Sequence, residues 1–232
     1  MNATVTAANA AIIAANAAIA AANADQNGNN APVPDAERAP PADEIAELAP
    51  TLERLRKAWR AKKPDYAQRM DDLARLKAAF KARMGEMEAA VRADYGHRSA
   101  HETLLADGMT VLGEIDHLRR HLRGWMRPKR ASVGWRLWPA SARIRHEAVG
   151  VVGVMSPWNY PVNLALVPLA TAIAAGNHVF VKPSEHTPQT SAWLQRLLAD
   201  VFPADRVAVA LGGAELGAAF SALPFDHLVF TG

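Results

Sequence analysis

The sequence predicts an α/β protein in which a helical N-terminal region precedes a domain built on a parallel sheet. Between residues 43 and 130, apolar residues recur at steps of three and four, as they do on the buried face of a helix. After residue 149, short and nearly continuous apolar strands alternate with helical segments, a pattern typical of a parallel sheet covered on both faces. Hydrophobic residues form 50% of the chain and charged residues 21%, which is the composition of a folded globular protein.

Residues 1–42 differ in composition and are expected to be a disordered tail and linker. Asparagines recur seven residues apart from Asn2 to Asn30, mostly among alanines. A coiled coil is disfavoured because alanine buries little surface, and a membrane helix because regular asparagines are costly in lipid. A secretory signal needs a basic residue before its apolar run, and none occurs before Arg38, so we expect a cytoplasmic location.

The helical region from 43 to 130 begins with two helices whose ends the sequence marks. Thr51 is expected to cap the first helix, which Pro64 ends. Asp65 is expected to cap the second, whose apolar stripe continues until Gly96 stops it.

A third helix is expected over residues 102–122, with Leu105 and Met109 on its buried face. Two pairs of histidines lie four residues apart, His97 with His101 and His117 with His121. No third ligand stands at a recognisable spacing from either pair, so no metal site is expected.

The charge balance and the lack of cysteine limit the partners and the chemistry. The chain has 26 basic and 23 acidic residues, a net charge of +3 that permits anionic partners but demands none. Basic clusters at 54–63 and 119–130 each contain a tryptophan, yet such clusters are more often the solvated face of a helix, so neither nucleic acid nor a membrane is expected as a partner. With no cysteine, these residues hold no disulfide, thiolate zinc site or cysteine nucleophile.

Polar residues and glycines follow the strands expected in the last third of the chain. The strands are expected at 149–155, 179–181, 206–211 and 227–231, with helices at 164–175, 187–201 and 214–222. In parallel sheets, ligands bind beyond the carboxyl ends of the strands. Those ends read Ser156-Pro157-Trp158-Asn159, Lys182-Pro183-Ser184-Glu185, Gly212-Gly213 and Thr231-Gly232. A cation, a carboxylate, an amide and glycines at one edge are what a dinucleotide with a polar reaction centre would need.

Several common motifs are missing from the sequence. Neither G-x-G-x-x-G nor G-x-x-x-x-G-K-[ST] occurs, which disfavours an ordinary Rossmann or P-loop enzyme. The absence of G-x-S-x-G removes the commonest type of serine hydrolase.

The motifs that are present resemble the cofactor domain of the aldehyde dehydrogenase superfamily. They are Ser156–Pro161, Pro168-Leu169, Ala172–Asn177, Lys182–Glu185 and Phe230–Gly232, in this order. The resemblance covers about residues 52–232, and segments 102–107 and 125–128 are most similar to coniferyl-aldehyde dehydrogenases. It implies an aldehyde-dehydrogenase-like fold, with a Rossmann-like cofactor domain after the helical region.

The resemblance implies a role for each polar residue at this edge. Asn159 matches the side-chain amide of the oxyanion hole, where a fixed N–H donor stabilises the alkoxide formed from an aldehyde. Lys182 and Glu185 match the residues that hold the adenosine ribose, and the carboxylate favours NAD, with NADP as the alternative. The other cofactor-binding residues implied are Ser156, Pro157, Trp158, Ser184, Gly213, Gly217, Thr231 and Gly232. The residues implied to line the aldehyde tunnel are Tyr160, Asn163 and Leu164.

The implied activity is NAD(P)-dependent oxidation of an aldehyde to a carboxylic acid, with an aromatic, coniferyl-type aldehyde as the narrower expectation. The family's catalytic cysteine and general-base glutamate would follow residue 232, so we expect a truncated chain, inactive alone, with an incomplete cofactor domain over residues 149–232. Residues 131–148 would form an oligomerisation hairpin, giving a homo-dimer or homo-tetramer when full length. Two alternatives stay open: a non-catalytic nucleotide-binding or oligomerisation module, and a basic nucleic-acid-binding protein.

Overall fold

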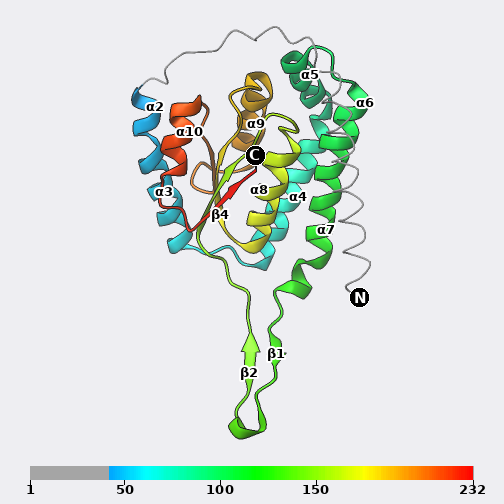
Figure 1. Ribbon diagram of the computed structural model, residues 1–232. Coiled ribbons are helices and arrows are strands. Elements are labelled where there is room, and N and C mark those ends of the chain that lie inside the picture. Colours follow the sequence, from blue (N-terminus) through cyan, green and yellow to red (C-terminus); the bar gives the residue numbers. More distant parts are fainter. Residues whose placement is uncertain (1–41, 232) are drawn as a thin grey trace. The chain divides into compact units, whose positions relative to one another are not determined.

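The computed structural model describes residues 42–231, in which helices surround a four-stranded parallel sheet (Figure 1). The strands are β3 (Val151–Met155), β4 (His178–Lys182), β5 (Val207–Val209) and β6 (His227–Phe230), in the spatial order β5-β4-β3-β6. The helices that precede the sheet are α2 (Ala42–Ala46), α3 (Leu48–Ala61), α4 (Tyr66–Ala82), α5 (Met84–Tyr95), α6 (Ala100–Thr103) and α7 (Thr110–Trp125). Those between the strands are α8 (Asn163–Ala175), α9 (Pro188–Val201) and α10 (Ala214–Ser221). The α/β fold with a parallel sheet is confirmed.

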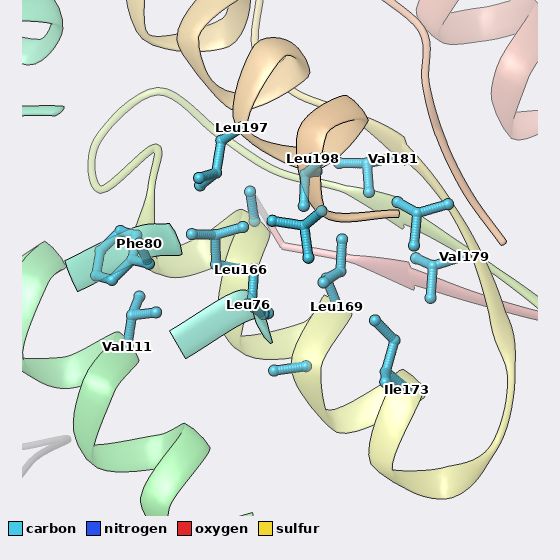
Figure 2. Packing of buried hydrophobic residues seen from close by; sticks show 14 of the residues in the cluster. Leu76, Phe80, Val111, Leu166, Leu169, Ile173, Val179, Val181, Leu197 and Leu198 are labelled. Atoms are coloured by element: carbon cyan, nitrogen blue, oxygen red, sulfur yellow. The ribbon is translucent and has the colours of Figure 1, made fainter. Parts of the chain in front are cut away.

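Helices cover both faces of the sheet, as the continuous apolar strands predict. Val152 and Val154 of β3 belong to a core that α4, α7, α8 and α9 complete, whereas Val151 and Phe180 face a second core shared with α3 and α10. In Figure 2, the α8 side chains lie between those of α4 and those of β4. The labelled residues are Leu76, Phe80, Val111, Leu166, Leu169, Ile173, Val179, Val181, Leu197 and Leu198.

The expected cap of the first helix is wrong, and that of the second is confirmed. Helix α3 begins at Leu48, so Thr51 lies inside it, where its hydroxyl accepts a hydrogen bond from Arg54. The helix starts earlier because Pro50 falls in its first turn, where proline is tolerated since the N–H has no helical partner. Asp65 caps α4 as expected, accepting from the N–H of Gln68 at 2.8 Å.

The expected third helix is interrupted by a π-helical turn, and two of its residues were assigned to the wrong face. Segment η1 (Leu104–Met109) separates α6 from α7. Leu105 is 66% exposed and Met109 53% exposed, because a π turn holds more residues than an α turn and shifts the side chains around the axis. Beyond it, Ile115 and Leu118 are buried.

A short hairpin joins the helical region to the sheet. Strands β1 (Lys129–Ala131) and β2 (Ala142–Ile144) pair antiparallel and extend away from the helices and the sheet (Figure 1). Trp135 and Trp138, in the connection between them, are each 82% exposed. This hairpin, from Lys129 to Ile144, overlaps residues 131–148, the segment implied to mediate oligomerisation, a role that stays a prediction.

Other expectations concern the tail, metals and membranes. The expected tail and linker lie outside the described residues, apart from Ala42, where α2 begins. Among residues 42–231, no group of three or more histidine, aspartate or glutamate side chains is arranged to hold a metal ion. The same residues include no helix that is both long and apolar enough to cross a membrane.

We expect Gly176→Ala to destabilise the protein by about 1–3 kcal/mol, because Gly176 ends α8 at φ +92°, a conformation that disfavours a side chain. The added methyl group would also overlap the guanidinium of Arg69, which donates to the carbonyl of Pro64. The free energy of unfolding from urea titration measures the effect. The control Gly85→Ala lies in α5 with open space around its Cβ and should stabilise by at most about 1 kcal/mol. Equal stabilities of the two variants would contradict this account.

Candidate functional site

The carboxyl ends of β3, β4 and β6 lie side by side. Met155 pairs with Lys182 on one side and with Phe230 on the other, so the three strands end at one level. Hydrogen bonds continue one residue further: the N–H of Ser156 donates to the carbonyl of Lys182, and the N–H of Thr231 to that of Met155, each at 3.2 Å. The polar segments that follow these strands therefore start from one edge of the sheet. Gly232, which was also assigned to the cofactor site, lies outside the described residues.

An ion pair between Lys182 and Glu185 lies at this edge. The Lys182 side chain is 5% exposed, and its Nζ lies 2.5 Å from Oε2 of Glu185, whose side chain is 32% exposed. Burial is the largest single influence and opposes ionisation of Glu185, but the hydrogen bond and charge of Lys182, the backbone N–H of Glu185 and His186 together outweigh it and keep the pKa of the carboxyl below its usual value. An ammonium donor beside a partly open carboxylate can hold a vicinal diol, such as that of a ribose.

The glycines near α10 leave room beside this ion pair. A Cβ at Gly217 would lie 3.6 Å from Cε and 3.7 Å from Nζ of Lys182, so the first turn of α10 packs over the lysine. Gly213 directly precedes α10, and a Cβ there would meet no atom within 4 Å. The helix begins beside the lysine ammonium with its N-terminal surface open.

The two serines of the site differ in their hydrogen bonding. Ser184 is buried in the connection between β4 and α9, where its hydroxyl accepts from the N–H of His186 and its carbonyl accepts from the Ser191 hydroxyl. The buried Oγ of Ser156 has no hydrogen-bond partner among the described residues. A buried polar atom of this kind calls for a polar partner, so Ser156 fits a site that binds a polar ligand.

Asn159 lies on the turn from β3 to α8, after the half-buried Pro157. Trp158 is 50% exposed, and its carbonyl accepts from the Tyr95 hydroxyl. The carbonyl of Asn159 accepts from Nη1 of Arg98 at 2.8 Å, while its exposed side-chain amide has no hydrogen bond to another described residue. The amide is thus available to donate to an oxygen on which negative charge develops.

The three residues implied for an aldehyde tunnel follow Asn159 but differ in their surroundings. Tyr160 packs its ring against Arg98, and its buried hydroxyl lacks a partner among residues 42–231. Leu164 is half-buried on α8. The side-chain amide of Asn163 donates to the carbonyl of Ala106 at 3.1 Å, so it ties α8 to the π turn.

Reasoning from the sequence missed Arg98 and Asp107, which lie directly behind the Asn159 turn. Their side chains are 6% and 0% exposed, and Nη2 of Arg98 lies 3.2 Å from Oδ2 of Asp107. Burial raises the pKa of Asp107 to about 6, against the opposing effects of the Asn163 N–H and of Arg98. The one local signal was Asp107 itself, a charged residue four positions before Val111 on a helical face that is otherwise apolar.

A separate hollow of about 810 Å³ lies between α2, α3, α9 and β5. Phe180, Phe202 and Leu216 contribute to its wall, with Arg54 and Arg196. Neither Asn159 nor the Lys182–Glu185 pair lines it, so it is distinct from the polar edge of the sheet.

Comparison with known proteins identifies the family. A family model described as "Aldehyde dehydrogenase family" matches residues 29–232. A probable coniferyl aldehyde dehydrogenase of Pseudomonas aeruginosa is 47% identical over 191 residues, which are 82% of this chain and 40% of that protein. A coniferyl aldehyde dehydrogenase of Pseudomonas sp. is 43% identical over 190 residues, covering 80% of this chain and 38% of that protein. The chain therefore spans about 40% of the length of the curated relatives it matches.

Solved structures agree with this comparison. A substrate-bound state of AldH from Staphylococcus aureus superposes with a TM-score of 0.75 at 29% identity, over 78% of this chain and 40% of that one. GapN from Methanocaldococcus jannaschii, complexed with NADP, gives a TM-score of 0.71 at 20% identity over 82% of this chain and 42% of that one, a likeness of fold. The fold, the family model and the relatives agree, and the chain belongs to the aldehyde dehydrogenase family.

Proposed function

We propose that this chain supplies the N-terminal part of an enzyme that oxidises an aldehyde to a carboxylic acid with NAD or NADP. The observation that carries the proposal is the presence of the Lys182–Glu185 pair and of the Asn159 amide at one edge of a parallel sheet in a member of this family. These 232 residues contain no cysteine, so a thiolate nucleophile has to come from residues outside them.

Asn159 acts on the oxygen of the aldehyde. Addition of a nucleophile to the carbonyl carbon places negative charge on that oxygen, and a fixed N–H donor stabilises the charge more than it stabilises the neutral carbonyl. The exposed amide of Asn159, on a turn held by its backbone carbonyl, suits this role.

Lys182, Glu185 and Ser156 fit a dinucleotide, which accepts the hydride released from the aldehyde. The carboxylate of Glu185 would accept hydrogen bonds from the ribose hydroxyls, and the ammonium of Lys182 would donate to them. A 2′-phosphate would meet the negative charge of Glu185, so NAD is favoured over NADP. The buried Oγ of Ser156 remains to bond a polar group of the cofactor.

The names of the relatives suggest the class of substrate. Three of them are described as coniferyl or probable coniferyl aldehyde dehydrogenases, so we propose an aromatic aldehyde, with Tyr160 and Leu164 beside its ring. We further propose that the complete protein is a homo-oligomer in the cytoplasm and that the exposed β1–β2 hairpin lies in the subunit interface.

Aldehyde oxidation is tested in a chimera in which residues 42–232 replace the matching part of the Pseudomonas aeruginosa relative. We expect NADH formation with coniferyl aldehyde, and none from the 232-residue chain alone. Asn159→Ala in the chimera should lower kcat by about 10²–10³ while KM for NAD stays within about twofold, because one oxyanion donor is lost. The control Gln195→Ala, at an exposed position of α9, should leave both values unchanged. Near-normal turnover of Asn159→Ala would refute the role of the amide.

A second prediction concerns the choice of cofactor. We expect Glu185→Gln to raise KM for NAD by about 10-fold or more, because a charged acceptor of the ribose is lost. KM for NADP should change less, since the variant no longer repels the 2′-phosphate and frees Lys182 to contact it. Initial rates with both cofactors measure the ratio, and an unchanged preference would count against the proposed ribose site.

A further inference from the structure

A buried ion pair lies behind the turn that carries Asn159. Arg98 and Asp107 are joined at 3.2 Å, with side chains 6% and 0% exposed. The guanidinium of Arg98 lies between two aromatic rings, 5.0 Å from the centroid of Tyr95 and 4.9 Å from that of Tyr160. The rings and the carboxylate hold the arginine in one orientation.

The ion pair grips the backbone at both ends of the turn. Nη1 of Arg98 donates to the carbonyl of Asn159, and Oδ1 of Asp107 accepts from the N–H of Asn163, each at 2.8 Å. Helix α8 has no side-chain cap of its own at Val162, so Asp107 caps it from the π turn. One ion pair thus links the carbonyl of Asn159 to the first turn of α8.

This arrangement fixes the backbone position from which the exposed side chain of Asn159 extends. The amide of Asn159 has no hydrogen bond to another described residue, so its position depends on the backbone that carries it. A displacement of about 1 Å at a reacting centre can cost about 100-fold in rate. A firmly held carbonyl at residue 159 would therefore matter to the reaction even though Arg98 and Asp107 touch no reacting atom.

We propose that Arg98 and Asp107 are positioning residues, which hold the backbone of Asn159 so that its amide meets the oxygen of the aldehyde. This inference rests on the proposed function. Burial raises the pKa of Asp107 to about 6, so the folded state binds the proton of this carboxyl more tightly than the unfolded state does. The ionised form, which pairs with Arg98 at pH 7, is therefore less favourable for stability than the protonated form. Asp107 thus contributes stability that is fully present below its unfolded pKa and is lost as the pH rises through about 6.

The first test uses Asp107→Asn in the 232-residue chain. The amide oxygen can still accept from Asn163, but the carboxylate that pairs with Nη2 of Arg98 is gone, while Glu102 stays 3.7 Å from its Nε. We expect the backbone amides of residues 159–164 to exchange hydrogen at least about 10-fold faster at pH 7, since local opening becomes easier. The melting temperature is measured alongside, so that faster exchange confined to residues 159–164 is distinguished from a general loss of stability caused by the unpaired Arg98 charge. The matched control Asp116→Asn breaks the ion pair between Asp116 of α7 and Lys77 of α4. It should leave hydrogen exchange in residues 159–164 unchanged.

The second test uses kinetics in the chimera. Asp107→Asn should lower kcat by about 10- to 100-fold with KM for NAD within about twofold, as expected for a misplaced donor. Arg98→Lys keeps a charge for Asp107 but lacks the fork that reaches Asn159, so its kcat should lie between those of the parent and Arg98→Met. A role in folding alone would lower the melting temperature and leave kcat of the folded fraction unchanged.

The pH dependence of kcat tests whether the charge of Asp107, rather than that of a neighbouring group, holds Arg98. The charged and titratable groups around Asp107 are Arg98, Glu102, Tyr95 and Tyr160. Protonation of Asp107 below pH about 6 should weaken the grip on Arg98, so kcat of the parent chimera falls there more steeply than kcat of Asp107→Asn. Identical profiles would overturn the inference.

The two proposals fail in different ways. An inactive parent chimera refutes the proposed function, while hydrogen exchange in the 232-residue chain still decides whether the ion pair holds the turn. Equal exchange in Asp107→Asn and Asp116→Asn overturns the positioning role whether or not the chimera is active. Equal kcat of Asp107→Asn and the parent, in an active chimera, overturns it as well.

Discussion

The parallel, in-register pairing of β3 with β4 and β6 is the constraint on which the rest of the structure depends. It brings Met155, Lys182 and Phe230 to one level, so that the segments after three strands far apart in sequence start together. A sheet of this kind is stable only when both faces are covered, and α8 and α9 on one side and α3 and α10 on the other meet that requirement. The polar edge is what this packing leaves open.

The helical region does more than cover the sheet. Asp94, at the end of α5, accepts from the backbone N–H groups of Gln189 and Thr190 and so caps α9, which has no side-chain cap from Thr187. Asp72 of α4 pairs with Arg206 just before β5 at 2.7 Å, with both side chains buried. A buried charge must be paired, so the contact between Asp72 and Arg206 requires α4 to lie in one place on the α/β domain, and the cap from Asp94 does the same for the end of α5.

Much of the fold followed from the sequence because it depends on local patterns. Continuous apolar strands such as Val151–Met155 predict a parallel sheet, and chain direction alone then places Asn159 and Lys182 at its carboxyl edge. The π turn was missed because no residue pattern marks it, and Leu105 was consequently placed on the wrong face. Arg98 and Asp107 were missed as members of the site because their partners lie more than fifty residues away, as for Arg98 and Asn159, separated by 61. The chemical roles at the edge came from the family resemblance and stay proposals.

The long sequence separation of these contacts also bears on how the protein acquires its structure. Strands β3 and β4 can pair once their connecting helix has formed, since that closure involves a short loop. The turn at Asn159 gains its last hydrogen bonds only when α5 and η1 dock, a closure that spans 61 residues for Arg98. The sheet and the turn should therefore form in separate steps. The helical region is synthesised first, and the turn at Asn159 becomes ordered when it packs against that region.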